Sequence, residues 1–83
     1  MGYFVYILYS NSINKYYVGH TDDLERRLHE HNTGQTRYTS SRGNRWTLVY
    51  QEAYDSRALA MKREREIKAQ KSRKYIENLI GKF

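Results

Sequence analysis

The sequence predicts a small α/β (α+β) domain in which helices flank a three-stranded antiparallel sheet, with the element order β-β-α-β-α-α. Three observations predict this fold. An apolar N-terminal run is followed by turn residues and a second strand-like run, a third such run follows the middle of the chain, and apolar residues recur at helical spacing in three other segments. The 83 residues leave room for a single domain, residues 1–83.

The first two strands are predicted to form a hairpin. Residues 3–9 are apolar or aromatic at every position, so we expect both faces of this strand to be covered. Turn residues occupy most of 10–14, and residues 15–20 have strand character. The short connection indicates antiparallel pairing.

The first helix is expected to begin at Asp22, which forms a capping box with Glu25 three residues later. It should run to about Asn32, with Gly34 available as a left-handed stop. The polar segment 33–45 lacks periodicity, and we predict a surface loop, where binding residues are often found.

Residues 46–54 return to strand character and predict the third strand. A second helix should begin at Asp55 or Ser56 and reach about Ala69. Ser72 is expected to cap a third helix. The packing residues of that helix are Ile76, Leu79 and Ile80.

The net charge is +6, and the segment 57–74, with eight basic and two acidic residues, accounts for all of it. Such a block suits a polyanion, most simply nucleic acid, bound with salt-sensitive affinity. A solvated helix face with ion pairs such as Glu64–Lys68 explains the same pattern. Membrane-surface binding is disfavoured, because no row of bulky apolar residues opposes the charges.

The chain has no cysteine, which excludes disulfides, thiolate nucleophiles and Cys-based zinc sites. It shows neither a signal-peptide pattern nor the run of about 20 apolar residues that a membrane span needs. We therefore expect a cytoplasmic protein without a membrane partner.

The first helix directs two polar side chains towards the sheet. At about 100° per residue, Arg27 and His31 share the face of Leu24 and Leu28, whereas Arg26 points the opposite way. A cation that faces a sheet needs a partner, or must line a cleft that an anion can reach. The alternative is an arginine that snorkels at the helix edge beside a histidine bonded to the backbone.

Two adjacent tyrosines, Tyr16 and Tyr17, leave opposite faces of the second strand. Gly19 lies on the face of Tyr17 and is expected to leave open space beside its hydroxyl, which Tyr6 flanks if the register allows. A phenol can bind phosphate, or act as a general base when its pKa is lowered. Because the chain has nine tyrosines, ordinary half-buried strand residues explain the pair as well.

Glu64 flanks the apolar stripe of the second helix that contains Ala60 and Ile67, so we expect it at the border between core and solvent. A carboxylate there can hold a hydrated Mg²⁺ ion that touches a substrate phosphate. Glu66 is a rival, and simple salt bridges explain both carboxylates.

Four motifs together resemble the GIY-YIG endonuclease superfamily, and most closely its small, stand-alone bacterial-type members. The stretches "FVYIL" (4–8) and "YVG" (17–19) resemble the paired GIY and YIG motifs. The stretch "DLERRLHEHN" (23–32) is similar to the arginine helix of that family, and "KREREIK" (62–68) to the segment with its metal-binding glutamate. The motifs occur in the family's order and span essentially the whole chain.

The resemblance implies a role for each matching residue. Tyr17 corresponds to a proposed general base for the attacking water, and Tyr6 to a tyrosine that helps position the reactants. Arg27 corresponds to the arginine that steadies the scissile phosphate. His31 corresponds to a helix histidine with a supporting role in proton handling.

The resemblance also implies a metal ion and a DNA substrate. Glu64 corresponds to the ligand of one divalent ion, Mg²⁺ or Mn²⁺, and Gly19 to the glycine that lets substrate approach closely. We expect arginines of the 33–45 loop and lysines and arginines of the basic block to contact backbone phosphates. These residues are Arg37, Arg42, Arg45, Lys62, Arg63, Lys68, Lys71, Arg73 and Lys74.

The expected function is metal-dependent hydrolysis of phosphodiester bonds in DNA. Without a separate recognition domain, we expect cleavage that is weakly sequence-specific, guided by DNA structure, or directed by a partner protein, as in DNA repair. Two alternatives stay open: a catalytically silent nucleic-acid-binding module, and an interaction subunit of a DNA repair or processing complex.

Overall fold

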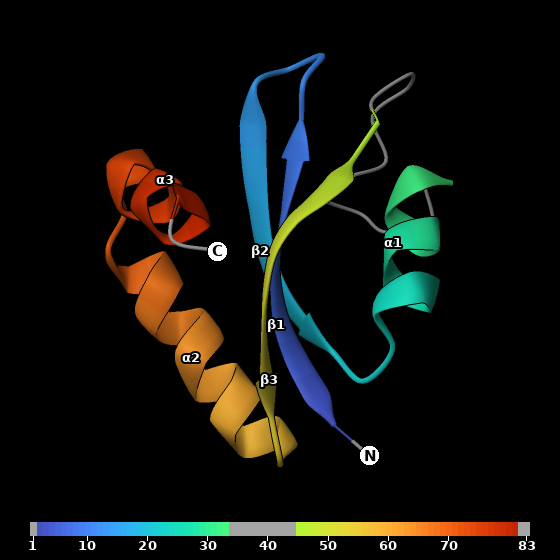
Figure 1. Ribbon diagram of the computed structural model, residues 1–83, viewed down its shortest axis with the longest axis vertical. Helices are drawn as coiled ribbons and strands as arrows, with labels where there is room; N and C mark the ends of the chain where they lie inside the picture. Colours follow the sequence, from blue (N-terminus) through green and yellow to red (C-terminus); the bar gives the residue numbers. More distant parts are fainter. Residues whose placement is uncertain (1, 34–44, 82–83) are drawn as a thin grey trace.

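The computed structural model describes residues 2–33 and 45–81, and its element order is the one predicted. Three strands form one antiparallel sheet with β1 in the middle, α1 covers one face, and α2 and α3 cover the other (Figure 1). The elements are β1 (Tyr3–Ser10), β2 (Lys15–Thr21), α1 (Leu24–Asn32), β3 (Thr47–Tyr54), α2 (Arg57–Ala69) and α3 (Arg73–Gly81). In this part of the chain, no helix is both long and apolar enough to cross a membrane. The predicted α+β fold is confirmed.

Strand β1 lies in the middle because it is apolar on both sides. Val5 and Ile7 are fully buried against the α2–α3 layer, and Tyr6 and Leu8 are buried against the α1 layer. Each such side chain contributes about 1.5–3 kcal/mol when it leaves water. The alternation of a strand therefore gives the sandwich two separate cores, one on each face of the sheet.

The hairpin register determines which side chains meet on the α1 face. Tyr6 pairs with Gly19, and Leu8 pairs with Tyr17. The turn before β2 contains Asn14 at φ 55°, a left-handed conformation that asparagine tolerates better than most residues.

The cap of α1 differs from the prediction by one residue. Asp23, not Asp22, has the extended backbone of an N-cap and accepts a hydrogen bond from Arg26 N at 3.1 Å. Thr21 Oγ1 accepts a bond from Asp23 N at 3.1 Å, which holds Asp23 at the turn before the helix. Asp22 instead pairs with the Arg26 side chain at 2.9 Å, and Glu25 lies too close to the cap to form the expected box.

The other element boundaries follow from local hydrogen bonds. Ser56 and Ser72 cap α2 and α3, each accepting a bond from the backbone N–H three residues later. Strand β3 begins at Thr47 rather than at Trp46, whose backbone N–H and C=O both bond to the Asn32 side chain, at 2.7 and 3.0 Å. The expected helix stop at Gly34 lies outside the described residues.

Candidate active site

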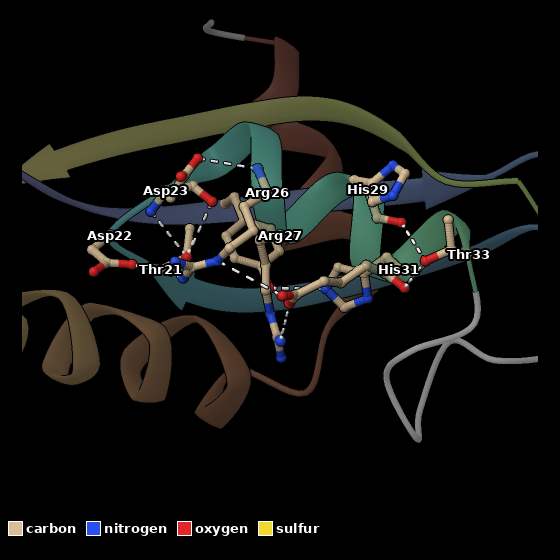
Figure 2. Close-up of polar contacts among 10 residues, drawn as sticks. Thr21, Asp22, Asp23, Arg26, Arg27, His29, His31 and Thr33 are labelled. Atoms are coloured by element: carbon tan, nitrogen blue, oxygen red, sulfur yellow. Dashed lines mark hydrogen bonds and ion pairs between the residues drawn. The ribbon is translucent and has the colours of Figure 1, made fainter.

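Tyr6 is the centre of a buried polar cluster between the sheet and α1. Its hydroxyl lies 3.0 Å from His31 Nε2 and accepts a hydrogen bond from Arg27 Nε at 3.3 Å. The Tyr6 and His31 side chains are almost completely buried. Arg27 and His31 of α1, labelled in Figure 2, both contact Tyr6 of the central strand, so they face the sheet as the helical spacing predicts.

Burial determines the protonation states in this cluster. It is the main reason that the pKa of His31 falls to about 4, and the charge of Arg27 adds to the effect. Burial also raises the pKa of Tyr6 to about 12, although the hydrogen bond from Arg27 opposes it. At neutral pH, a protonated Tyr6 can therefore donate to a neutral His31 while it accepts from Arg27. This arrangement suits Tyr6 to orienting its neighbours rather than to removing a proton.

The ring of Tyr17, on β2, packs against the buried cluster. Its ring is 4.7 Å from the His31 ring and 6.3 Å from the Tyr6 ring, measured between centroids, and Trp46 packs edge-on at 6.4 Å. Tyr17 also lines a cavity of about 390 Å³ between β2 and the α2–α3 layer. Tyr16 packs against the other core, so the predicted opposite orientation of the two tyrosines is confirmed. Tyr17 is half-buried whereas Tyr6 is 2% exposed, so Tyr17 is the more accessible of the two tyrosines.

The expectation of open space beside Gly19 is wrong. A Cβ atom at Gly19 would lie 2.5 Å from the Tyr6 hydroxyl and 3.1 Å from the Tyr17 ring. Because Tyr6 is the cross-strand partner of Gly19, its ring fills the space that the glycine leaves. Gly19 thus makes room for Tyr6, and the predicted flanking position of Tyr6 is confirmed.

Glu64 lies on α2, in the layer opposite α1. Its Oε1 is 2.6 Å from His20 Nδ1, and its Oε2 accepts a hydrogen bond from Lys68 Nζ at 2.6 Å. Burial raises the pKa of this carboxyl, but the bonds with Lys68 and His20 outweigh it and hold the pKa below its usual value. Glu64 is therefore an ionised carboxylate, and its side chain is 16% exposed, as expected for a residue at the border of the core.

His20 connects Glu64 to the α1 side of the molecule. It lines a hollow of about 110 Å³ with Glu64 and also a hollow of about 340 Å³ with Arg27. Both hollows are lined by His20, which belongs to the edge strand β2. The structure therefore places Tyr6, Tyr17, Arg27 and His31 in one cluster. Glu64 lies outside this cluster and contacts His20.

Arg63 of the basic block faces inward. Its guanidinium donates to both carboxylate oxygens of Glu52 on β3, at 2.9 and 3.2 Å, and to the Tyr75 hydroxyl at 3.3 Å. Glu66, the rival carboxylate, is half exposed and lies 3.5 Å from the same guanidinium. Arg63 therefore joins β3, α2 and α3, a different use from the expected phosphate contact.

Arg73 also makes contacts within the chain. It donates to Glu77 at 3.0 Å and to the backbone and side-chain oxygens of Asn14 at 2.9 and 2.5 Å, and it lies 5.0 Å from the centroid of the Tyr16 ring. It ties α3 to the hairpin turn. The remaining described members of the predicted phosphate-binding set are exposed: Arg45, Lys62, Lys68, Lys71 and Lys74. Arg37 and Arg42 lie outside the described residues.

Sequence reasoning did not assign His20 or Arg57 to the site. Strand alternation places His20 on the face opposite Gly19, but it does not identify Glu64 as its partner. Arg57 lines the larger hollow together with Arg26 and Arg27, and no local pattern connects it with the first helix.

Comparisons with known proteins identify the family of this chain. The family model described as the GIY-YIG catalytic domain matches residues 2–76. A UPF0213 protein of Natronomonas pharaonis is 40% identical over 80 residues, which are 95% of this chain and 91% of the relative. A UPF0213 protein of Haloquadratum walsbyi is 43% identical over 68 residues, or 81% and 74% of the two chains.

A solved structure has the same fold. The solution NMR structure of a UPF0213 protein from Bacillus halodurans superposes with a TM-score of 0.60 at 36% identity, covering 98% of this chain and 84% of the other. The match of the catalytic-domain family spans all three strands, both tyrosines, the arginine helix and Glu64. The chain therefore belongs to the GIY-YIG family.

Proposed function

We propose that this protein is a metal-dependent endonuclease that hydrolyses phosphodiester bonds in DNA. The observation that carries the proposal is the cluster of Tyr6, Tyr17, Arg27 and His31, in which one arginine and one tyrosine remain accessible beside two buried groups that orient them. The membership of the chain in the family of the GIY-YIG catalytic domain supports it.

Arg27 would bind the scissile phosphate. Its side chain is one third exposed, and Tyr6 and Glu30 hold its Nε and Nη1 at 3.3 and 2.9 Å, which limits its rotamers and leaves further donors for an anion. The hydrogen bond with Tyr6 raises the pKa of Arg27, so the guanidinium stays charged. A fixed cation of this kind stabilises the charge that develops on the phosphate in the transition state.

Tyr17 would accept the proton of the attacking water. It is half-buried whereas Tyr6 and His31 are buried, and the centroid of the His31 ring lies 4.7 Å from that of Tyr17, which restricts its orientation. Tyr6 and His31 would act as positioning residues, because both are buried and remain neutral near pH 7.

Glu64 would hold the divalent ion. Mg²⁺ keeps most of its waters and binds proteins through one or two carboxylates together with substrate phosphates, so a single ionised carboxylate fits it. Residues 2–33 and 45–81 contain no group of three or more His, Cys, Asp or Glu side chains able to hold a metal. An ion at Glu64 would compete with Lys68 and His20 for the carboxylate oxygens. When bound, Mg²⁺ supplies a Lewis acid that neutralises phosphate charge and lowers the pKa of its water.

The test is cleavage of supercoiled plasmid and of branched, duplex and single-stranded DNA in the presence of Mg²⁺, Mn²⁺ or EDTA. The parent should cut at least one substrate with either metal, and Tyr17→Phe and Glu64→Ala should abolish cleavage while DNA binding survives. Tyr9→Phe, which removes a hydroxyl at the far end of the hairpin, is the matched control and should retain activity. Cleavage that persists in Tyr17→Phe would refute the assigned base.

One observation favours a second candidate, a nucleic-acid-binding module without catalysis. Both oxygens of the Glu64 carboxylate already have partners within the chain. For such a module, neither Tyr17→Phe nor Glu64→Ala should change any measured property of DNA binding, and no metal should promote cleavage. Salt-sensitive binding without cleavage of any of these substrates would favour this candidate.

A further inference from the structure

A basic hollow of about 340 Å³ is lined by residues from the end of β2, the start of α1 and the start of α2. The ends of these elements lie in the lower half of Figure 1. Its lining is polar, and three arginines from two helices contribute to it. The lining residues are His20, Thr21, Asp22, Arg26, Arg27 and Arg57. Arg27 already has a role in the proposed reaction. Arg26 and Arg57 remain available to bind a further ligand in this hollow.

The charges around the hollow leave one cation in excess. Asp22 and Glu30 pair with Arg26 at 2.9 and 3.7 Å, and Glu30 also pairs with Arg27 at 2.9 Å. The hydrogen bond from Arg26 holds the pKa of Asp22 below its usual value, so this carboxylate stays ionised. Two carboxylates therefore face three guanidiniums, and the excess charge attracts an anion.

Arg57 supplies that excess charge. Its guanidinium carbon lies over the Tyr3 ring, 5.1 Å from the ring centroid, a cation–π contact that limits the motion of the side chain. The charge of Arg57 acts on Asp22, which agrees with its position beside the hollow. The exposed guanidinium of Arg57 offers several N–H donors in one plane, and the Tyr3 ring limits its motion, so it is suited to binding a phosphate group.

We propose that this hollow binds a second backbone phosphate of the DNA strand, adjacent to the one at Arg27, and that Arg57 is its main contact. The inference rests on the proposed function, since Arg27 marks the scissile phosphate. It assigns a DNA track that runs from the α2 N-terminus past α1 towards His20 and Glu64. Phosphates next to the cleaved bond position the strand without taking part in the reaction.

The test measures binding of a labelled single-stranded oligonucleotide in EDTA, over a range of salt concentrations, for the parent, Arg57→Gln and Lys15→Gln. Lys15 is an exposed lysine at the opposite end of β2 and is the matched control for loss of one charge. Arg57→Gln should weaken binding by about threefold to tenfold and reduce the slope of log K against log salt by about 0.7. Lys15→Gln should change both quantities much less. An equal effect of the two variants would overturn the inference.

A second measurement identifies the phosphate. The phosphates of the oligonucleotide are replaced one at a time by neutral methylphosphonates, and each is measured with the parent and with Arg57→Gln. At one position the replacement should weaken binding to the parent and have little effect on the variant, as for two members of one interaction. Additive losses at every position would contradict the contact. Inorganic phosphate alone should bind weakly; tight binding that Arg57→Gln removes would instead indicate a site for a free anion and overturn the assignment to DNA.

The two proposals can fail separately. Binding that depends on Arg57 without cleavage of any substrate would contradict the nuclease and leave the phosphate site intact. Cleavage that is insensitive to Arg57→Gln in both KM and kcat would contradict the site and leave the nuclease intact. If both hold, Arg57→Gln should raise KM by the same factor that it weakens binding, with kcat nearly unchanged, because this phosphate does not react.

Discussion

The buried imidazole of His31 makes the stability of this domain depend on pH. Its side chain is 1% exposed, and burial, together with the charge of Arg27, lowers its pKa from 6.5 to about 4. The unfolded chain therefore takes up this proton near pH 6.5, whereas the folded chain takes it up only near pH 4. Acid favours the state that binds the proton more readily, so the free energy of unfolding should fall as the pH drops through this interval.

The size of the effect follows from the pKa difference. At about 1.4 kcal/mol for each pKa unit, His31 should remove about 3 kcal/mol between pH 6.5 and pH 4. Small domains have a total stability of about 5–15 kcal/mol, so this single group accounts for a large part of the acid sensitivity.

The assay is denaturant unfolding at a series of pH values from about 7 to about 4 for the parent, His31→Gln and His29→Gln. His29 is exposed on the same helix, and its variant controls for loss of an imidazole. The parent and His29→Gln should lose about 3 kcal/mol more than His31→Gln over the range, because carboxylates that titrate there contribute equally to all three proteins. An identical pH dependence in His31→Gln and the parent would show that the imidazole is not held neutral in the folded protein.

Two further substitutions test the packing at Gly19 and the partners of Glu64. Gly19→Ala should lower the free energy of unfolding by about 1–3 kcal/mol, since the new methyl group meets the Tyr6 hydroxyl at 2.5 Å, whereas Gly81→Ala, with nothing within 4 Å, should change it by about 0.5 kcal/mol or less. Equal stabilities of the two variants in denaturant unfolding would disprove the close packing. Lys68→Met should tighten Mn²⁺ binding, followed by electron paramagnetic resonance, up to about fivefold, because the ammonium no longer competes for Glu64. An unchanged affinity would mean that the ion does not replace Lys68.

Strand and helix identities depended on residues close in sequence, and these could be predicted. Residues 3–9 predict a central strand because an apolar side chain at every position requires cover on both faces. Ser56 and Ser72 predict helix starts because a capping bond reaches only three residues along the chain. The error at α1 arose where Asp22 and Asp23 compete for one cap, and the bond from Asp23 N to Thr21 Oγ1 decides between them.

The spacing of the first helix also placed part of the candidate site. Arg27 and His31 had to share one face, and alternation had to separate Tyr16 from Tyr17. These rules say which way a side chain points, but they do not say what it meets. The ring of Tyr6 above Gly19 depends on a register set by the whole hairpin.

The sequence by itself determined the element order, the two-faced central strand and the direction of the tyrosines, Arg27 and His31, because each depends on short-range geometry. Only the tertiary structure decided that His20 holds Glu64 across 44 residues, that Arg63 turns inward to Glu52, and that Arg57 joins the hollow beside Arg27. Those pairings depend on how the two helical layers meet around the sheet. The distances between the α1 layer and the α2–α3 layer depend on the packing of the whole molecule, so no local sequence pattern predicts them.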